Sequence, residues 1–77
     1  MASPQSTMES IAVDQGLDDH VRYSAALLAL YSAQNQSARC ARDLLDRILP
    51  HFSDGVYAAV LADISRTIDE FGFVAFY

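Results

Sequence analysis

Residues 17–48 read LDDHVRYSAALLALYSAQNQSARCARDLLDRI, and this stretch decides the fold class. It is rich in good helix formers and contains neither glycine nor proline. A register with alternating steps of four and three residues runs through it unbroken, at Tyr23, Leu27, Leu30, Gln34, Ser37, Ala41, Leu44 and Ile48. The pattern predicts one long helix over about residues 18–49, ended by Pro50. Asn35 and Ser37 also suit a turn or a helix cap, which leaves a division into two helices open.

The segment after Pro50 predicts a second helix over about residues 54–71. Ser53 is a good N-cap residue, and Gly72 falls where many helices end in a left-handed glycine. Between them an apolar stripe recurs at helical spacing: Val56, Tyr57, Val60, Leu61, Ile64, Ile68 and Phe71. The short connection makes the two helices antiparallel. The expected fold is therefore all-α, a small helical hairpin or bundle completed by dimerisation.

The two ends of the chain differ from this central part. Residues 1–15 show no clear period and are expected to be a flexible N-terminal arm, so that residues 16–77 form a single helical domain. The domain ends in an apolar tail, FVAFY, at residues 73–77. Such a tail either packs across the helices or inserts into a partner, and a short strand paired with another chain is a further option.

The chain has more apolar side chains than a domain of its size normally hides. It has 77 residues, of which 52% are hydrophobic, while a chain this short buries only about 60% of its unfolded surface. The first helix is apolar on more than one side, so we expect part of it to meet another chain, and a homodimer is the simplest arrangement. The predicted partner-binding residues combine this helix with the tail: Tyr23, Leu27, Leu30, Tyr31, Phe73, Phe76 and Tyr77.

The charge balance excludes several classes of partner. Ten acidic residues against five arginines give a net charge of −5, which disfavours nucleic-acid backbones and anionic membrane surfaces. The sequence has no signal-peptide pattern and no apolar run long enough to cross a membrane. A cytoplasmic protein with no direct nucleic-acid or membrane partner is expected.

No motif in the sequence indicates catalysis or a cofactor. His20 and His51 are isolated, and Cys40 is the only cysteine, so no metal-ligand spacing is present. Asp69 and Glu70 are adjacent and therefore lie on different helix faces. We expect no cofactor and no metal, and we expect that the chain is not an enzyme.

Residues 17–48, followed by a break and then VYAAVLADISRTIDEF at residues 56–71, resemble small bacterial quorum-sensing anti-activators of the QslA type. The resemblance rests on length, acidity and helix layout, and it assigns a role to no individual residue. It implies a homodimer that binds a LuxR-type transcription activator and blocks its dimerisation or its DNA binding.

The function expected from these observations is inhibition of a protein partner through an apolar helix face. One alternative is a phage-encoded inhibitor such as an anti-CRISPR protein, which would bind by charge mimicry and respond strongly to salt. A second alternative is a secretion chaperone that shields a helical client. A third is a small enzyme subunit whose site forms only in an oligomer and uses His20 or His51.

Overall fold

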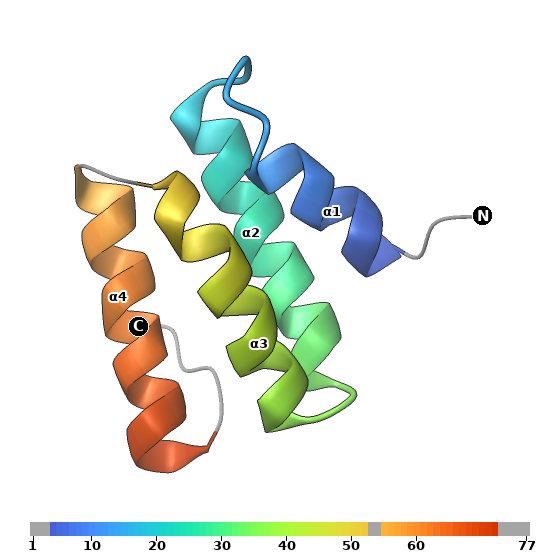
Figure 1. The fold of residues 1–77 in the computed structure, drawn as a ribbon, viewed down its shortest axis with the longest axis vertical. Helices are drawn as coiled ribbons and strands as arrows, with labels where there is room; N and C mark the ends of the chain where they lie inside the picture. The colour runs from blue at the N-terminus through green and yellow to red at the C-terminus, as the bar shows by residue number, and fades with distance from the viewer. Residues whose placement is uncertain (1–3, 53–54, 73–77) are drawn as a thin grey trace.

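A computed structural model describes residues 4–52 and 55–72 of the chain. This part folds into four α-helices and one short 3₁₀ turn: α1 (Pro4–Ala12), α2 (Asp19–Gln34), α3 (Ala38–Ile48), η1 (Leu49–His51) and α4 (Val56–Phe71). Figure 1 shows that α3 runs antiparallel to both α2 and α4, while α1 packs against the opposite side of the bundle from α4. The described residues contain no strand, which confirms the expected all-α class.

The single long helix predicted over residues 18–49 is wrong, because the chain turns between α2 and α3. Ser37 adopts an extended backbone with φ −170° and ψ 160°, and its hydroxyl accepts a hydrogen bond from the Cys40 N–H at 3.1 Å. This N-cap satisfies one of the N–H groups that a new helix leaves without a partner. The turn brings the apolar faces of α2 and α3 together, whereas a continuous helix of this length would extend for about 48 Å.

The flexible arm predicted for residues 1–15 is also wrong where the structure describes it. Residues 4–12 form α1, and Ala12 at its end is fully buried. The helix packs closely on α2, and four of the six buried residues of α2 are alanines: Ala25, Ala26, Ala29 and Ala33. Small side chains allow two helices to approach closely. The helix therefore owes its stability to tertiary packing, which a weak local pattern does not reveal.

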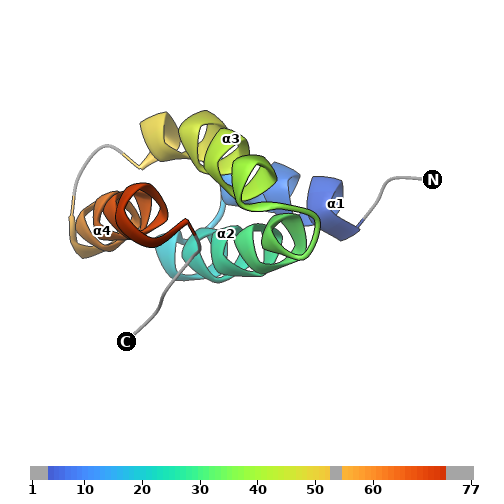
Figure 2. The ribbon, with the colours of Figure 1, turned by 90° about the horizontal axis from the view of Figure 1, so that it is seen from below.

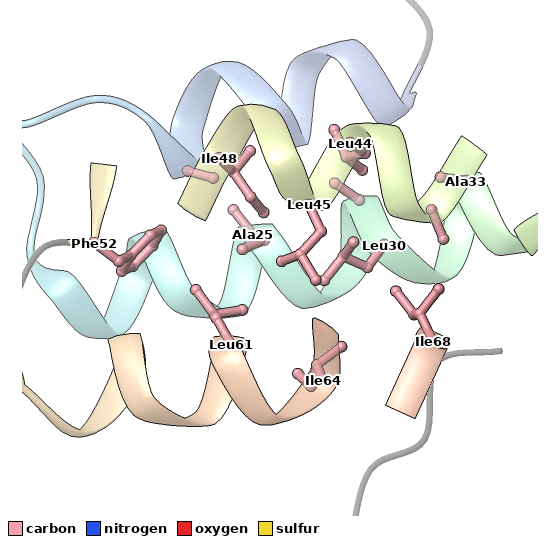
Figure 3. Close-up of a cluster of buried hydrophobic side chains, with 14 residues drawn as sticks. Ala25, Leu30, Ala33, Leu44, Leu45, Ile48, Phe52, Leu61, Ile64 and Ile68 are labelled. Atoms are coloured by element: carbon pink, nitrogen blue, oxygen red, sulfur yellow. The ribbon is translucent and has the colours of Figure 1, made fainter. Parts of the chain in front are cut away.

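Large aliphatic side chains from α2, α3 and α4 fill the centre of the bundle. The largest fully buried ones are Leu30, Leu44, Leu45, Ile48 and Leu61. Figure 3 shows Leu61, Ile64 and Ile68 pointing from α4 toward α2 and α3. The buried residues of α3 are Ala41, Leu44, Leu45 and Ile48, and three of them, all except Leu45, lie on the four-and-three register of the sequence.

The second helix predicted for about residues 54–71 is confirmed as α4, which begins at Val56 with Gly55 as its N-cap residue, while the predicted N-cap Ser53 lies outside the described residues. It ends as expected at Gly72, which has a left-handed φ of 77° and donates its N–H to the Ile68 carbonyl at 2.9 Å. Glycine adopts this conformation without the steric cost of a side chain. The ends of the predicted apolar stripe lie outside the core, since Val56 and Phe71 are exposed.

Arg22 joins three separate parts of the fold. Its side chain is buried, with Nε donating to the Ala12 carbonyl at 3.0 Å and Nη2 donating to the His51 carbonyl. The guanidinium carbon lies 4.5 Å from the centre of the Phe52 ring. Helix C-termini carry unpaired carbonyls and partial negative charge. One cation therefore stabilises the ends of both α1 and η1 while it remains attached to α2.

Candidate protein-binding surface

The side of α2 that faces away from the core carries three large exposed side chains. Val21, Leu28 and Tyr31 are 44%, 57% and 46% exposed, and their spacing of seven and three residues places them on one face of the helix. We call these three residues the α2 outer face. It lies on the other side of α2 from the buried residues Ala26, Leu30 and Ala33. Three of the six exposed large hydrophobic residues in the described part of the chain therefore share one face of α2; the others are Leu17, Val56 and Phe71.

No charged group lies on the α2 outer face. Between His20 and Ala38 the sequence contains a single charged residue, Arg22, and that side chain is buried and hydrogen-bonded. Charged residues make up 19% of the whole chain, so this gap is local. The centres of protein–protein interfaces are depleted in charge and enriched in aromatic residues. The composition of this face matches that description.

The charged surface of α3 lies on the opposite side of the molecule. Figure 2 places α3 on one side of α2, and the buried stripe of α3 faces inward, so its charged residues point away from α2. Several of these charges are paired within the chain. Arg47 forms two hydrogen bonds to the Glu9 carboxylate, at 3.0 and 3.1 Å, and Arg42 pairs with Asp69 of α4. The hydrogen bond to Glu9 raises the pKa of the Arg47 guanidinium.

A pair of stacked tyrosines forms a contact between α2 and α4. The rings of Tyr23 and Tyr57 stack with their centres 4.6 Å apart and an angle of 26° between the ring planes. Burial raises the pKa of the Tyr23 phenol, and the nearby phenols of Tyr57 and Tyr31 act in the same direction. Tyr23 is half-buried and packs against the core, as does Leu27. These two side chains therefore contribute to the packing against the core and are only partly exposed.

The structure separates the residues that the sequence grouped as partner-binding. Leu30 belongs to the core, with 0% exposure, and is not available to a partner in this fold. The side of α2 on which it lies is covered by other helices of the bundle. Tyr31 is exposed, whereas Phe73, Phe76 and Tyr77 lie outside the described residues. The partner-binding set predicted from the sequence omits Val21 and Leu28, which the structure places on the α2 outer face. The run of alanines in α2 was the available signal, because it marks the inward face and leaves these two residues on the other side.

The described residues offer no arrangement suited to a metal ion. They contain no cluster of three or more His, Cys, Asp or Glu side chains. His20 and His51 are both exposed, and the Cys40 thiol contacts the Gln36 side chain at 3.8 Å. None of the described helices has the length and apolar character needed to cross a membrane.

Comparison with known proteins finds no match among family models, curated proteins or solved structures. The resemblance to QslA-type anti-activators is therefore not tested and stays a prediction. The α2 outer face is the feature of this chain from which a function can be argued.

Proposed function

We propose that this chain is a non-enzymatic regulatory protein that binds another protein through the α2 outer face and inhibits it. The observation that carries the proposal is the exposure of Leu28 and Val21 on a helix face without charge. Leaving such side chains in water forgoes about 25 cal/mol for each Å² of apolar surface that a partner would cover. Contiguous exposed apolar patches commonly mark interaction sites.

The mode of inhibition follows from the geometry of a helix face. An exposed apolar helix can occupy a groove, or replace a helix that the partner uses for its own dimerisation. The resemblance to QslA-type anti-activators makes a LuxR-type transcription activator the expected partner. Binding at its dimer contact would prevent the activator from assembling on DNA, without any contact between this acidic chain and the nucleic acid.

Site-specific photocrosslinking tests the proposal. A benzophenone amino acid would replace Leu28 in the full chain, expressed in the organism that encodes it, with the same substitution at Asp43 as the matched control. Both positions are exposed, but Asp43 lies on α3 at the far side of the molecule. We expect a covalent adduct with a second protein from position 28 and none from position 43. Equal labelling from both positions, or no adduct from position 28, would refute the proposal.

Point substitutions provide an independent test of the same face. Leu28→Glu and Tyr31→Asp place a charge on exposed positions, so they should weaken complex formation at least tenfold while leaving the far-UV circular dichroism unchanged. Leu30→Asp is not a valid probe of binding, because it buries a carboxylate in the core and would unfold the chain. Complex formation that survives both exposed substitutions would exclude this face.

A further inference from the structure

The N-terminal end of α2 places negative charge beside the α2 outer face. Asp14 lies in the preceding loop, Asp18 is the N-cap residue, and Asp19 begins the helix; we call these three residues the acidic edge. All three are exposed, and Asp19 is paired with the buried Arg22 at 3.2 Å. From Val13 to Ala38 the sequence contains no other lysine or arginine. Within residues 13–38 the exposed side chains with a permanent charge are therefore all negative.

We propose that the α2 outer face receives an amphipathic helix of another protein, one that carries lysine or arginine residues at one end of its apolar stripe. This inference rests on the proposed function and specifies the chemistry of the partner. The distance along α2 from Val21 to Tyr31 is about 15 Å, which corresponds to roughly three turns of a ligand helix with apolar residues at i, i+3 or i+4, and i+7. The basic end of that helix lies against Asp14 and Asp18, where opposite charges speed association and fix the direction of binding.

A second copy of this chain fits the same face poorly. If two α2 helices met in parallel, their acidic edges would lie together. If they met antiparallel, each acidic edge would face the C-terminal end of the other helix, which carries partial negative charge. Neither arrangement brings the arginines of α3 to an acidic edge, because the buried stripe of α3 faces the core and its charged residues lie on the other side of that helix. Each copy also has a net charge of −5, which adds repulsion.

A pair of synthetic helical peptides tests the sign of the charge. Both would have 18 residues and the same leucine stripe; one carries three lysines at its end, and the other has glutamate at those three positions. Fluorescence anisotropy of the labelled peptides with the full chain measures affinity at low and high salt. We expect the lysine peptide to bind more tightly than the glutamate peptide by at least tenfold at low salt, with the difference shrinking as salt screens the charges.

Matched substitutions in the protein locate the effect. Asp14→Asn with Asp18→Asn removes two charges but preserves local structure, since asparagine can still accept the Gly16 N–H and Asp18 makes no side-chain cap bond. This double variant should bind the lysine peptide about three- to tenfold more weakly. Asp43→Asn with Asp46→Asn changes the net charge equally on α3 and should leave binding unchanged. Leu28→Glu should reduce it at least tenfold.

The outcomes separate this inference from the proposed function. Three results would overturn the proposal that a basic helix binds this face. They are equal affinity for the two peptides, equal effects of the two double variants, and peptide affinity that is unchanged by Leu28→Glu. Self-association that Leu28→Glu abolishes would overturn it in favour of a second copy. A crosslink from position 28 to a different protein, together with any of these results, leaves the proposed function in place, whereas the absence of such a crosslink removes the proposed function itself.

Discussion

At the scale of single residues, Arg22 explains how a charge can be buried in so small a bundle. Removing a guanidinium from water is costly unless its donors find partners. Here the donors reach the Ala12 and His51 carbonyls and the Asp19 carboxylate, while the Phe52 ring covers one face of the group. The two carbonyls come from segments 39 positions apart in the chain, so one side chain couples the α1–α2 contact to the α3–α4 connection.

Replacing Arg22 with methionine should lower the free energy of unfolding by about 2–4 kcal/mol, because the buried Ala12 carbonyl and the part-buried His51 carbonyl then lose a charged donor. Urea denaturation followed by circular dichroism at 222 nm measures the change. Arg39→Met is the matched control, since Arg39 is exposed, and it should shift stability by less than about 0.5 kcal/mol. If the two variants proved equally stable, the coupling role assigned to Arg22 would be incorrect.

Tyr23 gives the fold a sensitivity to alkaline pH. Its pKa in the folded chain lies above the usual value of 10.0, mainly because of burial, so folding favours the protonated phenol. This contribution to stability is fully present below pH 10 and is lost as the pH rises through the raised value. We expect Tyr23→Phe to lose less stability than the original chain between pH 8 and pH 11. Absorbance titration at 295 nm should show that the variant lacks a component titrating above pH 10; an unchanged titration curve would contradict the shift.

At the scale of helices, the break between α2 and α3 shows how a cap overrides a continuous register. The four-and-three spacing passes through Gln34 and Ser37 without interruption, and both flanking segments favour helix. Ser37 nevertheless starts a new helix through its hydrogen bond to the Cys40 N–H. Burying Leu44, Leu45 and Ile48 against α2 yields more than the few backbone hydrogen bonds that a continuous helix would keep.

Ser37→Ala should lower the free energy of unfolding by about 1 kcal/mol, because the first turn of α3 loses its capping acceptor. Ser32→Ala, inside α2, is the control and should change stability by less than about 0.5 kcal/mol, since alanine is the better helix former. Thermal unfolding of both variants measures the difference. A Ser37→Ala chain as stable as the Ser32→Ala chain would show that the turn does not depend on this cap.

At the scale of the whole molecule, the surface of the folded chain is no larger than that of an ordinary monomer. Its accessible area is 4710 Å², and monomeric proteins of this mass, 8.5 kDa, expose about 4,700 Å². The high apolar content is accommodated by fully buried alanines in α2 and by the packing of α1. Leu28 is therefore not exposed because the core is too small to hold it. It is exposed because it lies on the side of α2 that faces away from the core.

Homodimerisation, expected from composition, stays a prediction. Size-exclusion chromatography with light scattering at micromolar concentration should give twice the chain mass of 8.5 kDa. Because the acidic edges of two copies would repel each other at the α2 outer face, we expect such a dimer to use a different surface. Leu28→Glu should therefore leave the measured mass unchanged. A stable monomer over this concentration range would exclude the dimer without affecting the proposal that α2 binds a different protein.

The sequence by itself determined the all-α class, the presence of α4 and its end at Gly72, and three of the four buried positions of α3, because these follow from local periodicity and capping. Only the tertiary structure decided the rest. It folded residues 4–12 into α1, turned the chain at Ser37, placed Leu30 in the core and left Leu28 exposed. A helix that is apolar on all sides, such as α2, has no preferred face of its own. Its inward side is set by which neighbours pack most closely, and here the alanines allow that approach.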